Sequence, residues 1–510
     1  MQRRDQPILF VLALSFALLS TAIEAAPRDQ PAAKGHPPAV VDRALRNTSS
    51  MRVTSAELAA LRADLIRIKS DFDVRLSALQ ARLDQSEARR TASLIARDTT
   101  PATDSAIPSD PKLDAATSSP PGPAILVSAT DSAAASAGGG NAFNPDIGLN
   151  LQGRYGAFRR APDIRTVGGF QLGGEPGPGA KGLSLGESEL SLSANIDNLF
   201  YGFANLAFNQ SEGQSSVDVE EVYLQTTALP AGFTIRAGQF FANLGYQNSR
   251  HSHAWDFVDQ PLAYEAMLGG QFLDAGVRVS WLAPTDLFVE LGVEAFRGDR
   301  FPASGAARDG VGATNVYARL GGDFSDSSAW QAGIAWLASQ PRQRHNEDAN
   351  GQTTEFSGDS NLIAADVLWK WAPQGNFNER NLIVQAEWLH RRESGRLNLL
   401  SGAAPERGSY QGTQDGWYIE SVYQFIPRWR IGARYDQLDG NNRIAGLSES
   451  TVLDADGHVP RRYSAMLDFS NSEFSRFRLQ YNRDATTAHA ADEFYVQYIM
   501  SLGAHGAHAF

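Results

Sequence analysis

The end of the chain, residues 492–510, alternates between apolar positions and positions that are mostly polar or small. One parity carries Phe494, Val496, Tyr498, Met500 and Leu502. Successive side chains of a β-strand point to opposite faces, so this pattern predicts a strand with one apolar face. The same parity continues to a terminal Phe510.

The same alternation recurs from Phe143 to the end of the chain, in about sixteen segments. An even number of alternating segments is what a single-chain antiparallel β-barrel in a membrane needs, because only alternate residues face lipid. The clearest apolar rows are Ile147, Leu149, Leu151 and Tyr155; Ala275, Val277, Val279 and Trp281; Leu287, Val289, Leu291 and Val293; Trp330, Ala332, Ile334 and Trp336; Ile363, Ala365, Val367, Trp369 and Trp371; Trp429, Ile431, Ala433 and Tyr435; and Phe477, Leu479 and Tyr481.

The residues between these apolar rows are polar or small, and we expect them to face a water-filled lumen. The charged candidates for pore-lining residues are Arg278, Glu290, Glu294, Arg430, Arg434, Arg476 and Arg478. Further glutamates share this inward parity: Glu189, Glu221, Glu387 and Glu420. A lumen lined by both signs of charge predicts weak ion selectivity rather than a dedicated phosphate site.

Short and long connections alternate along the predicted strands, as they do in outer-membrane barrels. The predicted short turns are Asp197-Asn198, Pro230–Gly232, Pro284–Asp286, Ser325–Ser328, Pro373–Glu379, Pro427-Arg428 and Asn471-Ser472. The predicted long loops are 159–183, 209–216, 242–274, 298–314, 340–360, 394–415, 438–461 and 484–491. A soluble β-sandwich, the alternative fold, has water at both ends and gives no reason for this alternation.

Six outward aromatic residues lie beside the short turns and predict a girdle at one membrane interface. They are Trp281, Phe324, Trp330, Trp371, Phe425 and Trp429. A mean hydropathy of -0.30 argues against a bundle of transmembrane helices. The predicted fold class is therefore an all-β transmembrane β-barrel of about 16 antiparallel strands over residues 143–510.

The first part of the chain carries four segments of different character. Residues 1–25 have basic, apolar and small-residue parts in the order of a secretory signal peptide. Residues 26–53 have the composition of a disordered segment. A capping box at Thr54 and Glu57 opens a leucine-rich stripe that predicts a coiled-coil helix over 54–93, in the periplasm. Residues 94–142 form a low-complexity linker.

The long loop 242–274 holds the candidates for a metal site or a constriction loop, His251, His253, Asp256 and Asp259. Imidazole and carboxylate suit zinc, so zinc is one possible ligand. The favoured interpretation is a polar loop folded into the lumen, where its groups bond the wall and narrow the pore. We predict no resident cofactor and no established metal ligand set.

Four stretches resemble a proteobacterial outer-membrane family that is labelled porin-like or zinc-regulated TonB-dependent receptor. These stretches are 185–190, 251–262, 281–287 and the ending 503–510. The order of coiled coil and barrel also resembles the phosphate-selective porin O/P group. That resemblance implies a homotrimer, and the terminal Phe510 is typical of the closing strand that the barrel-assembly machinery reads.

Two short motifs that could indicate an enzyme lack their structural context. Gly177-x-Gly179-x-x-Gly182 is interrupted by prolines and precedes a strand, whereas a dinucleotide site needs a helix there. Gly182-x-Ser184-x-Gly186 lacks the strand-to-helix turn of a nucleophile elbow. The only histidine that a barrel wall could place as a base, His390, shares the outward parity of Trp388. We therefore predict no enzyme activity.

The sequence thus predicts a channel of the bacterial outer membrane for passive diffusion of small polar solutes or ions. The alternatives are a TonB-dependent or zinc-linked receptor and a structural tether of the outer membrane. The predicted partners are outer-membrane lipid and further copies of the chain. A net charge of -12 gives no basic surface for nucleic acid.

Overall fold

The computed structural model describes residues 145–158, 167–173, 177–211, 214–306, 310–347, 352–401, 405–448, 452–455 and 457–503. The predicted signal peptide, disordered segment, coiled coil and linker lie outside these residues. So do Phe510 and the assembly signal that it was expected to carry. These expectations stay predictions.

The described residues form one closed antiparallel sheet of eighteen strand segments. Closure comes from β1 and β18, which pair from Gly148↔Gly503 to Phe158↔Glu493. Two strands of the wall are each divided into two segments. β2 and β3 both pair with β1, and β10 and β11 both pair with β12. The eighteen segments therefore make a barrel of sixteen wall strands, which confirms the predicted fold class.

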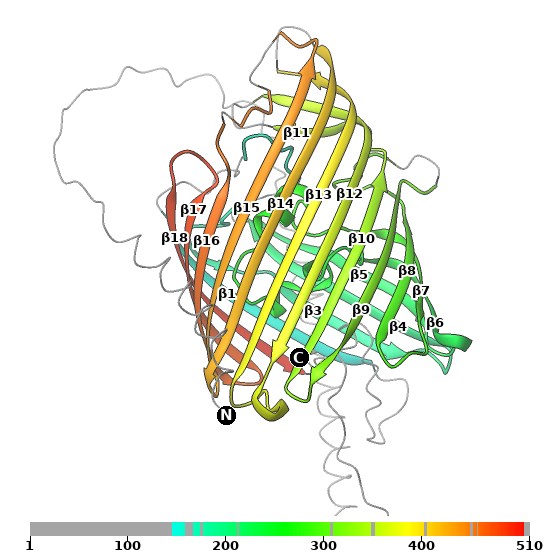
Figure 1. Ribbon diagram of the computed structural model, residues 1–510, viewed down its shortest axis with the longest axis vertical. Helices are drawn as coiled ribbons and strands as arrows, with labels where there is room; N and C mark the ends of the chain where they lie inside the picture. Colours follow the sequence, from blue (N-terminus) through cyan, green and yellow to red (C-terminus); the bar gives the residue numbers. More distant parts are fainter. Residues whose placement is uncertain are drawn as a thin grey trace, which may run out of the picture. The chain divides into compact units, whose positions relative to one another are not determined.

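The strands follow the chain order around the ring (Figure 1). Their bounds are β1 Asp146–Phe158, β2 Gly182–Leu185, β3 Ser188–Asn195, β4 Phe200–Ser211, β5 Gln214–Thr226, β6 Phe233–Phe241, β7 Leu273–Leu282, β8 Phe288–Phe296, β9 Ala313–Ser325, β10 Ser328–Ser339, β11 Arg344–Glu347, β12 Thr353–Trp371, β13 Asn381–Leu399, β14 Glu406–Ile426, β15 Trp429–Ala445, β16 Arg461–Ser472, β17 Ser475–Ala485 and β18 Ala491–Gly503. One α-helix, α3 Leu262–Leu268, lies among the described residues together with four short 3-10 turns.

The predicted apolar rows form the outer face of the wall. In β18, Phe494 and Val496 are exposed, whereas Tyr495 and Gln497 between them are buried. His390 lies on the outer parity, stacked on Trp388 with the ring centroids 5.4 Å apart. The helices of the described part of the chain are all too short or too polar to cross a membrane.

The short turns occur where the sequence predicts them, with one exception. β16 ends at Ser472 and β17 begins at Ser475, so the last turn is Glu473-Phe474 and the prediction of Asn471-Ser472 is wrong by two residues. Asn471 and Ser472 belong to β16 instead, because its ladder with β17 ends only at the pair Ser472↔Ser475.

Several predicted long loops are instead extensions of the wall. β13 runs to Leu399 and β14 begins at Glu406, so most of the predicted loop 394–415 is a paired ladder. β15 likewise runs to Ala445 and shortens the predicted loop 438–461. β12 to β15 form the tall side of the barrel (Figure 1). The apolar alternation fades there although backbone pairing continues, so periodicity alone did not find these strands.

The interior of the barrel contains an apolar core at the level of the long loop between β6 and β7, which we call the inserted loop, Ala242–Phe272. Its helix α3 is fully buried and packs against β13, β14 and β15. The core combines loop residues with wall residues, among them Leu244, Leu262, Met267, Phe272, Phe296, Leu389 and Tyr418. At this level the inserted loop and its apolar core occupy part of the lumen, which the sequence predicts to be filled with water.

Candidate functional site: the inserted loop and its histidine cluster

The inserted loop is fixed at its start by carboxylates of the wall. The backbone N–H of Phe241 donates to Glu221 at 3.2 Å, and that of Asn243 donates to Glu294 at 3.1 Å. Further along, the N–H of Leu262 donates to Asp436 at 2.9 Å. These bonds satisfy backbone groups that would otherwise be buried without partners.

A tight turn of the loop sits on Glu387 of β13. The N–H groups of Tyr246 and Gln247 donate to its two carboxylate oxygens at 3.0 and 2.9 Å, and the Tyr264 hydroxyl donates at 2.6 Å. Gly245 has a φ of +74°, and a Cβ there would lie 2.2 Å from Glu387 Oε2. Only glycine therefore lets the backbone approach Glu387 this closely.

The middle of the loop carries acids that meet arginines of β15 and β16. Asp256 accepts from Arg430 of β15 at 2.8 Å. Asp259 accepts from Arg434 at 3.0 Å and lies 3.2 Å from Arg462 of β16. The loop is thus held by both acids and arginines of the wall. Asp256 and Asp259 thus bond the wall of the barrel, and the expectation that the loop narrows the pore stays a prediction.

Asp256 is held in its charged form by this environment. Burial alone would raise the pKa of its carboxyl group, but Arg430, Arg476 and Arg478 outweigh burial and hold the pKa below its usual range. The facing acid Asp468 opposes them. Asp256 therefore contributes a fixed negative charge to its ion pair with Arg430, which anchors the loop to β15.

The seven expected pore-lining residues lie on the inward parity of the wall, and several of them bond the loop. Arg278 pairs with Glu294 at 2.5 Å and donates to the Phe241 carbonyl at 2.7 Å. Arg478 pairs with Asp468 at 2.9 Å. The groups that bond loop backbone or loop acids are Glu294, Arg430, Arg434, Arg476 and Arg478. Arg278 bonds the end of β6 just before the loop, and Glu290 accepts from the Tyr317 hydroxyl. Most of these residues therefore bond the inserted loop. Their positions in the sequence did not predict these bonds.

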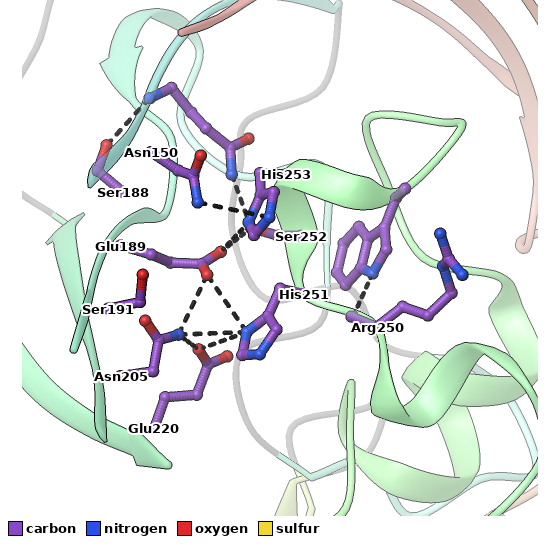
Figure 2. Close-up of polar contacts among 12 residues, drawn as sticks. Asn150, Ser188, Glu189, Ser191, Asn205, Glu220, Arg250, His251, Ser252 and His253 are labelled. Carbon is purple, nitrogen blue, oxygen red and sulfur yellow. Dashed lines mark hydrogen bonds and ion pairs between the residues drawn. The ribbon is translucent and has the colours of Figure 1, made fainter. Parts of the chain in front are cut away.

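The histidines of the loop are brought to a different part of the wall than Asp256 and Asp259. His251 Nδ1 lies 3.0 Å from Glu220 and 3.2 Å from Glu189 (Figure 2). Its Nε2 lies 3.1 Å from Glu221. His253 Nδ1 lies 3.0 Å from the second oxygen of Glu189. We call these five residues the histidine cluster.

Two irregularities of the wall place the acids of this cluster. In β5, Asn205 pairs with Glu221 and Leu206 pairs with Val219, so Glu220 is an extra residue in a β-bulge. The bulge turns Glu220 and Glu221 to the same side, where both are buried. Sequence reasoning identified Glu189 and Glu221 as inward but missed Glu220. The signal was the slip of the outward row from Val217 and Val219 to Val222 and Leu224.

A second bulge lies next to Glu189. Gly153 pairs with Leu185 and Asn150 pairs with Glu189, which leaves one extra residue between β2 and β3. The Ser188 hydroxyl accepts from the Gln152 N–H at 3.1 Å at this break. Bulges re-aim side chains near functional sites, and here two of them face the same loop.

The charge state of His251 follows from its neighbours. Burial alone would lower the pKa of its imidazole, but the carboxylates of Glu189 and Glu220 outweigh burial and hold the pKa well above its usual range. Without a metal ion, the ring therefore carries a positive charge that offsets part of the surrounding negative charge.

Comparisons with known proteins give similarities to this chain but show no family for it. No family model matches it. An uncharacterized protein of Aquifex aeolicus (strain VF5) is 29% identical over 348 residues, which cover 65% of this chain and 70% of that protein. The outer membrane channel DcaP of Acinetobacter baumannii is similar with a TM-score of 0.45 and 12% identity, over 70% of this chain and 97% of that chain. A loop L8 deletion mutant of OmpT from Vibrio cholerae has a TM-score of 0.43 and 12% identity, over 70% and 99%.

Proposed function

We propose that the protein is a channel of the bacterial outer membrane through which small polar solutes or ions diffuse passively, with a pore narrowed by the inserted loop. The observation that carries this proposal is a closed barrel with an apolar outer face. A loop lies inside it and is bonded to several strands of its wall. An apolar outer face suits lipid, and an interior rich in charged groups suits water and polar solutes.

The charges around the loop support a channel of weak selectivity. Arg430 and Arg476 lie beside Asp256 and Asp468, so both signs occur within one part of the wall. Opposite charges that face each other create a transverse field, which orients polar solutes without excluding one sign of ion. A phosphate-selective channel would instead present a run of arginines without neighbouring acids.

The TonB-dependent receptor is the weaker alternative. Such receptors enclose a plug in a barrel of about 22 strands, whereas this barrel has sixteen wall strands. Passive diffusion requires no energy source and is the simpler function. The structural tether is the other alternative and predicts a barrel without permeability.

We propose in addition that the protein forms a homotrimer in the outer membrane. The leucine-rich stripe of residues 54–93 supports association through a periplasmic coiled coil. The apolar outer rows of the barrel would contact outer-membrane lipid, and Phe510 would be read by the barrel-assembly machinery.

Solute uptake by proteoliposomes tests the channel proposal. Vesicles that contain the folded, heat-modifiable full-length protein should swell in iso-osmotic solutions of small sugars or amino acids. The rate should fall with solute size and need no energy source. Protein-free vesicles are the control. Vesicles that contain folded protein but remain impermeable would contradict the proposal and favour the tether.

A further inference from the structure

The acids of the histidine cluster are paired differently from other buried acids of the barrel. Glu294 pairs with Arg278 at 2.5 Å, and Glu393 pairs with Arg344 at 2.7 Å. Glu189 and Glu220, in contrast, form their ion pairs with imidazoles. Imidazole together with carboxylate is a common ligand set for a divalent transition-metal ion, whereas guanidinium binds no metal.

Three atoms of the cluster are spaced as ligands of one metal ion. Glu189 Oε2, Glu220 Oε2 and His251 Nδ1 all lie within 4.8 Å of one another. The nitrogen is 3.2 Å from the first oxygen and 3.0 Å from the second. Tetrahedral zinc with bonds of about 2.0–2.1 Å holds its ligand atoms about 3.3 Å apart. The nitrogen is therefore near this spacing from both oxygens, and the two oxygens lie within 4.8 Å of each other.

Neighbouring side chains form hydrogen bonds to the three residues. In metal sites, such hydrogen bonds hold the ligand side chains in orientation. Glu221 lies 3.1 Å from His251 Nε2 and can accept its N–H, which would leave Nδ1 free for a metal. Glu221 is itself fixed by the backbone N–H of Phe241. His253 Nδ1 lies 3.0 Å from Glu189 Oε1, the oxygen that points away from the three atoms.

Asn205 gives an independent indication of a ligand at this position (Figure 2). Its Nδ2 lies 3.1 Å from Glu189, 2.6 Å from Glu220 and 3.2 Å from His251, so an amide donor occupies the place beside all three atoms. Its Oδ1 is buried and has no hydrogen-bond partner. Rotation of the amide by half a turn would exchange the two atoms and aim this oxygen at the same place.

We propose that Glu189, Glu220 and His251 bind one divalent transition-metal ion, with zinc as the best fit, and that the Asn205 amide oxygen or a water takes the fourth position. Glu189 lies on β3 and Glu220 on β5, while His251 lies on the inserted loop. The ion joins these three segments and fastens the loop to the wall. The site stands on its own geometry and does not depend on the protein being a channel.

Titration calorimetry of the folded full-length protein in detergent tests the site directly. Zinc chloride, after treatment of the protein with chelator, should bind with one ion per chain. His251→Ala and the isosteric Glu220→Gln should each abolish this binding. Glu221→Gln should weaken it by roughly 10–100-fold, because it removes an orienting partner.

His345→Ala is the matched control, because His345 lies 3.9 Å from Glu355 but is exposed. This variant should bind zinc as the parent does. Heat-modifiable migration in gels identifies the variants that retain the barrel. Cobalt(II) should give the intense visible absorption of a tetrahedral site in the parent and lose it in Glu220→Gln.

Three outcomes would overturn the proposal. The first is no zinc binding by the folded parent protein. The second is binding that persists in folded His251→Ala or Glu220→Gln, which would place the ion elsewhere. The third is a preference for calcium or magnesium, since these ions favour all-oxygen sites. Solute permeability of the metal-free protein is measured separately, so failure of the site leaves the channel proposal intact.

Discussion

At the scale of residues, the loop is held by a few ion pairs rather than by contact area alone. Asp259 is the centre of one group, since it meets Arg434, Arg462, Gln480 and Asn482. Buried charges depend on their partners, so the loss of one partner costs far more than the loss of an exposed pair. The spacing of these residues in the sequence gave no sign that they would meet.

Asp259→Asn should therefore loosen the inserted loop. Breaking a buried ion pair costs about 3–5 kcal/mol, and the remaining acids Asp436 and Glu265 would offset part of this cost. We expect noisier single-channel current and faster proteolysis within residues 242–272. Asp299→Asn, which removes an exposed pair with Arg297, is the control and should change neither. Equal behaviour of the two variants would show that the loop does not depend on this anchor.

The depressed pKa of Asp256 sets a pH window for the second anchor. A carboxyl group with a lowered folded-state pKa stabilises the fold above its ordinary pKa, and this contribution is lost as the pH falls through the folded value. The difference in thermal stability between the parent and Asp256→Asn should stay constant from pH 7 to about pH 4 and shrink only below that. A difference that already vanishes near pH 6 would contradict the assigned charge.

At the scale of elements, the sequence predicted what depends on local alternation. The strand number, the outward rows and nearly all short turns follow from a period of two, and the structure confirms them. The extensions of β13 to β15 were missed because their apolar alternation fades. Glu220 was missed because a bulge breaks the parity, and the path of the loop was not predictable since it depends on partners more than a hundred residues away.

The outer face of β18 allows a test at this scale. Val496 is exposed and pairs with Tyr155 of β1 and Leu479 of β17, which are also exposed. Val496→Arg should lower the yield of heat-modifiable barrel, because a lipid-facing arginine costs roughly 2–4 kcal/mol near the bilayer midplane. Val496→Leu is the control and should assemble normally. Equal assembly of both variants would contradict the prediction that this face of β18 contacts lipid.

At the scale of the whole molecule, a predicted association of chains adds to the lipid-facing barrel and its internal loop. The association rests on residues 54–93, whose seam includes Leu61, Leu65, Phe72 and Leu79. Linking helices to barrels that associate raises their effective concentration to the millimolar range, so a weak coiled coil would form.

We expect a trimer in mild detergent that dissociates more readily when those four seam residues are changed to polar ones. Light scattering coupled to size separation measures the mass of the protein in the complex. The control is a variant of the same segment in which polar residues outside the leucine-rich stripe are replaced by other polar residues. A parent protein that is monomeric in several detergents would contradict the trimer and would favour a tethering role for this segment.

Single-channel conductance in planar bilayers tests whether the inserted loop narrows an open channel. The folded parent protein should show steady, voltage-tolerant current steps with weak ion selectivity. A variant that lacks residues 251–259 should show larger steps, because it loses the part of the loop that carries His251, Asp256 and Asp259 and bonds the wall inside the barrel. A folded barrel that conducts no current in either form would contradict the account.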